Sequence, residues 1–227
     1  MKGYRIVFIR HGMTDANEDG RYIGTTDLPL SSKGAMELYD KIEKFEYPSV
    51  QKVYTSPLKR CKQTASILYP NCYTVDLDLL KEMDFGDFEN KKAEDIMDLP
   101  EYKEFIKGGL DNPPPHGESI RDVVNRCFEA INIIISDMMY EGMTSAAVVT
   151  HGGIIMNMLS CFGVPKKKPI EFSCDFGEGY EVIVTASMWQ RSGAFEILGR
   201  YPQREEQDEY FIADAYEDDD KEDNEEK

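Results

Sequence analysis

Two histidines stand at the ends of short apolar runs, and each is followed at once by glycine. His11 closes the run 6–10, and His151 closes the run 146–150. Histidine titrates near neutral pH and can act as a nucleophile, a cation or a hydrogen-bond donor. Two such junctions far apart in the chain predict one shared site at the edge of a sheet. Arg10, directly before His11, indicates that the ligand is an anion.

Further polar residues follow the other predicted strands. Asn17 lies in the loop behind His11, Arg60 falls in the first turn of a helix after the second strand, and Glu82 follows the third strand region. Ligands bind at the carboxyl ends of strands in open α/β sheets. A phosphoryl site without a metal needs a nucleophile, cations for the non-bridging oxygens and an acid for the leaving oxygen. His151 also opens a predicted helix, whose free N–H groups favour an anion.

The elements that must position these residues are predicted from hydrophobic periodicity. Short apolar runs alternate with amphipathic stretches, which is typical of a layered α/β domain. Strands are expected at 6–10, 53–55, 73–77, 146–150, 181–186 and 195–198, the last two joined as a hairpin across 191–193. Helices are expected from about 32 to 45 behind a serine cap, and at 58–68, 118–139 and 153–162. A charged stretch at about 88–116 is expected to be an inserted helical cap over the pocket.

Composition places the chain among ordinary globular proteins. Its 227 residues, 41% hydrophobic and 30% charged, suffice for one α/β domain or two small ones. No apolar run reaches eighteen residues, so no spanning helix is expected, and the first residues do not resemble a signal peptide. Five cysteines without a Cys-x-x-Cys pair fit free thiols in a reducing compartment. These features together predict a cytoplasmic protein with no membrane contact.

The net charge of −17 is concentrated near the carboxyl terminus. Residues 205–227 hold 13 acidic residues against two lysines, a charge of −11. Such a block is self-repelling, and we expect it to be disordered, with residues 1–204 as the folded domain. Its expected role is solubility, with contact to a basic partner as the alternative. An acidic chain also argues against nucleic acid, whose binding depends on neutralising phosphates, and leaves a small phosphorylated metabolite as ligand.

Four motifs in this order resemble the histidine phosphatase superfamily, whose members have the phosphoglycerate mutase-like fold, over residues 5–200. The motifs are Arg10-His11-Gly12-Met13-Thr14 with Asn17, Arg21, Gly24 and residues 27–30, then residues 56–65, residues 82–89, and His151-Gly152-Gly153. The resemblance implies a three-layer α/β/α sandwich with a mostly parallel sheet and a small helical cap insertion.

The resemblance also implies a role for each residue. Neutral His11 would attack phosphorus and form a phosphohistidine, and Glu82 would protonate the leaving alkoxide and then activate water. Arg10, Arg60 and His151 would hold the transferring oxygens. Asn17, Gly24 and Gly152 would contribute to substrate binding. No metal and no other cofactor is implied.

His116, the third histidine, stands where the family more often has glycine. Contact with the leaving group and a plain surface position both remain open for it. Asn90 is a second departure, since the family often has glycine after this glutamate, and it bears on the local turn only. Glu118 and Ser119 are expected to cap the long helix, and Glu118 also suits a supporting role behind the site.

Hydrolysis is favoured over the mutase reaction of the same fold. The mutases carry an adjacent arginine pair between the acid and the second histidine, whereas Arg121 and Arg126 are separated here. Gly153 and Phe85 stand where the mutases have asparagine and tyrosine. The motifs look most like those of the α-ribazole phosphatase and broad-specificity phosphatase group. Mutase-type transfer and a non-catalytic phospho-ligand-binding protein remain alternatives, and the sequence does not indicate an oligomeric state.

Overall fold

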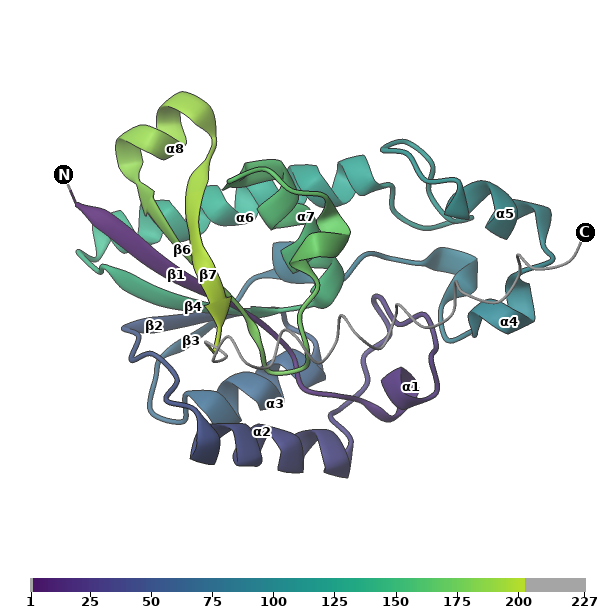
Figure 1. Cartoon of the computed structure of the whole chain (residues 1–227), viewed down its shortest axis with the longest axis horizontal. Helices are drawn as coiled ribbons and strands as arrows, with labels where there is room; N and C mark the ends of the chain where they lie inside the picture. The colour runs from purple at the N-terminus through teal and green to yellow at the C-terminus, as the bar shows by residue number, and fades with distance from the viewer. Residues whose placement is uncertain (1, 203–227) are drawn as a thin grey trace, which may run out of the picture.

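Seven strands form one mixed sheet in the order β3-β2-β4-β1-β6-β7-β5 (Figure 1). The computed structural model describes residues 2–202, so the predicted acidic tail lies outside the described residues. The strands are β1 (Gly3–Arg10), β2 (Lys52–Thr55), β3 (Thr74–Asp76), β4 (Ser145–Thr150), β5 (Gly163–Val164), β6 (Gly179–Thr185) and β7 (Phe195–Tyr201). Only β6 of these seven runs against the others, which confirms the mostly parallel sheet.

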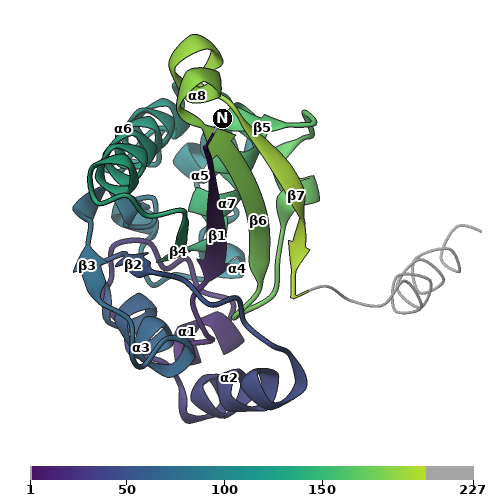
Figure 2. The same cartoon turned by 90° about the vertical axis from the view of Figure 1, so that its left-hand side faces the viewer.

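Helices cover both faces of the sheet and give three layers (Figure 2). The helices are α1 (Asp15–Glu18), α2 (Ser32–Lys44), α3 (Lys59–Leu68), α4 (Ala93–Ile96), α5 (Pro100–Ile106), α6 (Ile120–Tyr140), α7 (Gly152–Phe162) and α8 (Ala186–Ser192), with short 3₁₀ turns η1 (Asp78–Leu80), η2 (Gly86–Phe88) and η3 (Pro169–Phe172). Helices α2 and α3 lie on one face, and α6 and α7 lie on the other. None of the helices within residues 2–202 has both the length and the apolar character needed to cross a bilayer.

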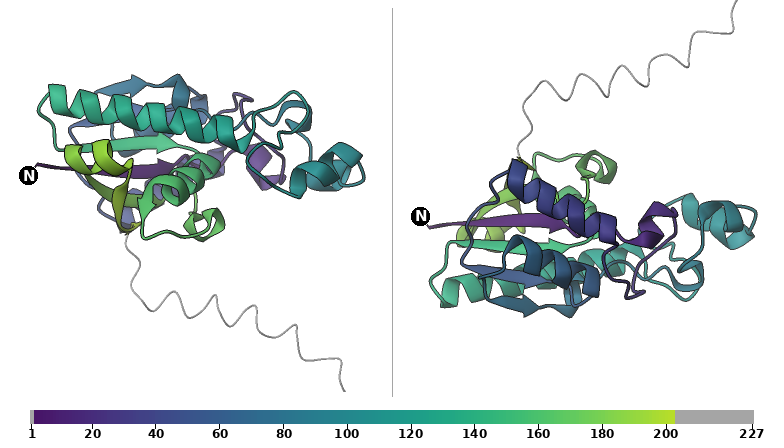
Figure 3. Two further views of the ribbon diagram at one scale, coloured as in Figure 1. Left: turned by 90° about the horizontal axis from the view of Figure 1, so that it is seen from above. Right: turned by 90° about the horizontal axis from the view of Figure 1, so that it is seen from below.

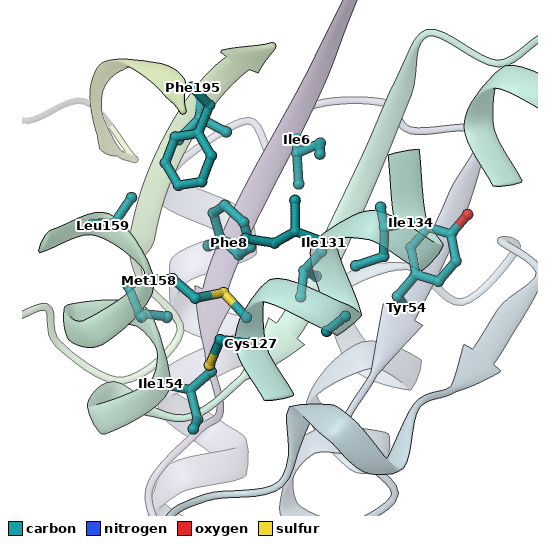
Figure 4. Close-up of a cluster of buried hydrophobic side chains, with 14 of the residues drawn as sticks. Ile6, Phe8, Tyr54, Cys127, Ile131, Ile134, Ile154, Met158, Leu159 and Phe195 are labelled. Carbon is teal, nitrogen blue, oxygen red and sulfur yellow. The ribbon is translucent and has the colours of Figure 1, made fainter. Parts of the chain in front are cut away.

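The central strands bury both of their faces because side chains alternate along a strand. On β1, Ile6 and Phe8 join the core beneath α6 and α7, whereas Val7 and Ile9 join the core above α2 and α3. Figure 4 shows Ile6 and Phe8 among side chains of the first core, including Ile131 from α6. The continuous apolar run of β1 is therefore what a strand between two helical layers requires.

The predicted hairpin between the last two strands is wrong. Strands β6 and β7 do pair antiparallel, but the chain between them forms α8 instead of a tight turn. Thr185 caps this helix by accepting a hydrogen bond from the backbone N–H of Met188, and Gly193 ends it in the left-handed region with φ of 56°. The Arg-Ser-Gly signal thus marks a helix end, which needs the same glycine conformation as a turn.

The stretch predicted as a cap holds the short helices α4 and α5 beyond the carboxyl ends of the parallel strands (Figure 3). It has a small apolar cluster of its own, made by Phe88, Ile96 and Tyr102. Tyr22, from the loop after α1, packs against this cluster. This stretch is therefore tied to the segment that follows the first histidine.

Candidate active site

The register of the sheet explains why the two histidines meet. Strands β1 and β4 are parallel neighbours in which Arg10 pairs with Thr150, so His11 and His151 leave the sheet side by side. Their ring centroids lie 5.1 Å apart at an interplanar angle of 65°. The structure thus brings together the two histidine-glycine junctions at one edge of the sheet (Figure 1).

His11 is buried, and its ring orientation leaves one nitrogen available. Its Nδ1 lies 2.6 Å from the carbonyl oxygen of Gly12, which can only accept, so Nδ1 carries the proton. In the neutral ring Nε2 then keeps its lone pair. Burial, followed by the charge of Arg60, holds the pKa of His11 well below its usual value. The free site therefore contains a neutral imidazole, which is the nucleophilic form.

Arg10 lies between an aromatic ring and a glycine. Its guanidinium carbon lies 3.9 Å from the ring centroid of Phe176, and its Nη1 donates to the carbonyl of Cys174 at 2.7 Å. A Cβ at Gly152 would stand 3.2 Å from Arg10 Nε, so glycine there leaves room for the guanidinium. Arg10 Nε is buried and has no hydrogen-bond partner among the described residues. Arg10 is thus held in a fixed place with a donor still to be satisfied.

Arg60 and His151 form a buried pair directly behind His11. Arg60 Nε donates to His151 Nδ1 at 3.3 Å, which places the proton of the neutral imidazole on Nε2. That Nε2 lies 2.9 Å from Ser56 Oγ. Burial, followed by electrostatic interactions with His11 and Arg60, holds the pKa of His151 well below its usual value. His151 is therefore a neutral ring with both nitrogens engaged.

Glu82 is buried at the start of α7. Its Oε1 accepts from its neighbour Met83 N at 2.9 Å, and its Oε2 accepts from Gly153 N at 3.1 Å. Burial raises the pKa of Glu82, although these N–H groups and two arginines oppose the shift. A Cβ on Gly153 would lie 2.7 Å from Glu82 Oε1, so glycine there makes space for the carboxyl. The site therefore pairs a base of lowered pKa with an acid of raised pKa.

A cavity of about 220 Å³ opens at this edge of the sheet. Its walls include five of the predicted site residues, namely Arg10, His11, Asn17, Glu82 and Gly152. The Oδ1 of Asn17 accepts from the backbone N–H and the hydroxyl of Thr14, which leaves the amide N–H groups of Asn17 as its donors. Within residues 2–202, no three histidine, cysteine, aspartate or glutamate side chains gather so that they could hold a metal ion.

Four predicted site residues do not line this cavity. Arg60 and His151 are buried and are not among its lining residues, and the carbonyl of Gly24 accepts from Arg60 Nη2 at 2.7 Å. His116 lies apart from the other histidines, with its side chain 84% exposed and its Nδ1 3.1 Å from Asp87. The structure thus places His116 on the surface of the cap side, in a left-handed conformation with φ of 59°.

The remaining lining residues are not among the predicted site residues. They are Arg21, Tyr22, Ile23, Phe85, Gly153, Met156, Ser173 and Cys174. Arg21 and Phe85 lie in the quoted motifs, and this could have marked them as candidates for the site. Ser173 and Cys174 follow η3 in a segment without a motif, and only the return of the chain beside β1 brings them to Arg10.

Comparisons with known proteins identify the family. The model of the histidine phosphatase superfamily (branch 1) matches residues 6–192. PhoE of Bacillus subtilis, an uncharacterized phosphatase, is 30% identical over 157 residues, covering 68% of this chain and 75% of its own. A probable phosphoglycerate mutase, GpmB of Cronobacter sakazakii, is 30% identical over 132 residues. That match covers 56% of this chain and 61% of GpmB, less than two thirds of its length.

The fold has a close match among solved structures. The α-ribazole phosphatase of Shigella flexneri superposes with a TM-score of 0.70 at 25% identity. The superposition covers 81% of this chain and 92% of that one. Because the family model matches residues 6–192, most of the sequence, the chain belongs to the histidine phosphatase superfamily (branch 1).

Proposed function

We propose that this protein is a phosphomonoester hydrolase that acts on a small phosphorylated metabolite through a phosphohistidine on His11. The observation that carries the proposal is the pairing of neutral His11 with Glu82, an acid of raised pKa, on the walls of one cavity. A nucleophile and an acid whose pKa values are shifted in these opposite directions are what transfer from an ester requires.

In the first step, His11 Nε2 attacks phosphorus in line and the bond to the ester oxygen breaks. The proton on the Glu82 carboxyl moves to the departing alkoxide, which leaves as an alcohol. Arg10 and Arg60 offset the charge on the non-bridging oxygens. Arg60 uses three N–H groups in the structure, toward Gly24, Thr26 and His151, and a guanidinium has five. His151 would reach an oxygen by exchanging Ser56 Oγ for it.

In the second step, water attacks the phosphorus of the phosphohistidine. The Glu82 carboxylate takes a proton from this water, the bond from phosphorus to Nε2 breaks, and inorganic phosphate leaves. Glu82 is then protonated again and His11 neutral, so the cycle closes without a cofactor. Tyr22, Phe85 and Met156 line the cavity beside these groups and would contact the leaving group.

The mutase reaction remains the second candidate because relatives include a probable phosphoglycerate mutase. Retaining an anionic glycerate calls for extra cations facing the leaving group. Arg121 pairs with Asp111, and Arg126 donates to the carbonyls of Leu79, Lys81 and Glu82, so both cations are used elsewhere. This favours hydrolysis. Conversion of 3-phosphoglycerate to 2-phosphoglycerate, faster than release of phosphate, would support the mutase instead.

The proposal is tested by hydrolysis of p-nitrophenyl phosphate in EDTA. We expect the wild-type chain to remain active, and His11→Ala to lose at least about a thousandfold in kcat. His116→Ala is the matched control, because this exposed histidine lies off the cavity, and it should stay within about twofold of wild type. Loss of activity on chelation, or full activity of His11→Ala, would refute the mechanism. Phosphate binding without any turnover would instead support the non-catalytic alternative.

A further inference from the structure

Glu89 is a half-buried acid that joins two loops of the site. It follows η2, and its carboxylate accepts from the backbone N–H groups of Gly24 at 2.9 Å, Thr25 at 3.1 Å and Thr26 at 3.3 Å. The hydroxyl of Thr26 donates to the same carboxylate. The second loop, which follows Glu82, contributes the N–H of Phe85, at 3.1 Å. Five donors on one carboxylate leave it little freedom to turn.

The loop that Glu89 holds is the loop that holds Arg60. The carbonyl of Gly24 accepts from Arg60 Nη2 at 2.7 Å, and the carbonyl of Thr26 accepts from Nη1 at 2.8 Å. Glu89 thus takes the N–H groups of residues 24–26, and Arg60 takes carbonyls of the same residues. Because each peptide unit is planar, fixing the N–H of Thr25 also fixes the direction of the Gly24 carbonyl, which belongs to the same unit. Hydrogen bonds in such chains also strengthen one another.

Close packing makes this arrangement depend on Gly24. A Cβ at position 24 would lie 1.8 Å from the carbonyl oxygen of Met83 and 2.4 Å from Glu89 Oε1. The loop can therefore rest against the segment that carries Glu82 only because this position has no side chain. Glu89 bonds to both segments at this contact, through Gly24 and Phe85.

We propose that Glu89 is a positioning residue that holds Arg60 in place for the phosphoryl oxygens, by way of the loop 24–26. This rests on the proposed hydrolase function, in which Arg60 contacts the transferring group. Glu89 does not line the cavity, so it acts through the loops that it holds, and the loop 24–26 is the one that contacts Arg60. An acid that only stabilised the loop would change the stability of the protein and leave the contribution of Arg60 to catalysis and anion binding unchanged.

A double-mutant cycle separates these two roles. The variants are Glu89→Gln, Arg60→Ala and the combination, with Asp87→Asn as the matched control. Asp87 is an exposed acid of the same loop, and its carboxylate lies beside His116. Two quantities are measured: kcat and KM for p-nitrophenyl phosphate, and the Kd for orthovanadate by titration calorimetry. Vanadate mimics the transferring group, so its affinity reports on Arg60 without any turnover.

We expect Glu89→Gln to lower kcat/KM about 10- to 100-fold and to weaken vanadate binding by a similar factor, as loss of an outer partner does in other sites. In the Arg60→Ala background the same change should alter either quantity by about twofold or less, because the two residues act as a unit. Asp87→Asn should leave kcat/KM and vanadate affinity unchanged, whether Arg60 is present or replaced by alanine. Equal losses from Glu89→Gln with and without Arg60 would overturn the proposal.

Thr26→Val provides a second route if Glu89→Gln does not fold. It removes one of the five donors and should produce a smaller loss, of about threefold, that again disappears without Arg60. Vanadate binding also distinguishes a failure of the hydrolase function from a failure of the role of Glu89. Absence of ester hydrolysis in the wild-type chain, with the vanadate cycle as expected, would refute the hydrolase function and leave the role of Glu89 standing.

Discussion

At the scale of single residues, the site depends on two groups whose pKa values move in opposite directions. Burial lowers the pKa of His11 and raises the pKa of Glu82. The sequence predicted the types and order of these residues. The resemblance implied a neutral His11 and a protonated Glu82, but the sequence could not predict their physical cause, which is burial and the carbonyl and N–H groups that surround the ring and the carboxyl.

These shifts predict the pH dependence of kcat/KM. Activity requires neutral His11, so on the acid side it should fall only well below the usual histidine pKa of 6.5. Activity also requires protonated Glu82, so it should decline as pH rises through a pKa above 4.5. Glu82→Gln should remove this alkaline limb and reduce the hydrolysis of an alkyl phosphate by about 10²- to 10⁴-fold.

The reduction should be smaller with p-nitrophenyl phosphate, since p-nitrophenolate leaves without help from an acid. The measurement is a pH–rate series on both substrates for wild type and Glu82→Gln. An unchanged alkaline limb in the variant would mean that another group supplies the proton.

At the scale of elements, the edge of the sheet and the start of α7 place the reactive groups. Hydrophobic periodicity predicted most strands and helices because buried strands of this sheet carry continuous apolar runs. It missed α8, since the glycine that ends this helix gives the same signal as a hairpin turn. It also missed β5, which has two residues and therefore no period to detect.

The first turn of α7 must carry glycine at position 153 because the Glu82 carboxyl occupies the space of a side chain there. Gly153→Ala should force the carboxyl to turn, since the new Cβ would lie 2.7 Å from Oε1. We expect kcat for an alkyl phosphate to fall about 10- to 100-fold. Orthovanadate affinity should change little, because Arg10 and Arg60 remain in place.

Stability should also change little, since alanine is favoured over glycine in a helix by about 0.5–1 kcal/mol and this offsets part of the strain. Discontinuous assays on the purified variant measure kcat for the alkyl phosphate, and calorimetry measures its stability. Retention of full kcat would show that Glu82 has another productive position.

At the scale of the whole molecule, residues from four separated stretches form the site. His11 and Asn17 come from the first strand and its loop, Glu82 from the segment after η1, Gly152 from the start of α7, and Cys174 from the loop that returns to β6. The motifs located the first three. Cys174 and Tyr22 reach the cavity through the path of the chain between elements, which no local pattern encodes.

The acidic character of the chain does not extend to this cavity. Arg10 and Arg21 line it, so an anion finds cations there in a protein with a net charge of −17. Attraction of a phosphorylated ligand is therefore a local property of the site and not of the molecule's overall charge.

The phosphohistidine on His11 is tested by a rapid-quench experiment with a ³²P-labelled phosphomonoester, followed by mapping of the labelled residue. We expect a transient phosphoenzyme that is stable to alkali and labile to acid, as a phosphohistidine is. The label should map to His11 and be absent from His11→Ala, while His116→Ala should label like wild type. Turnover without a labelled protein, or label on a residue other than His11, would show that the reaction does not pass through His11.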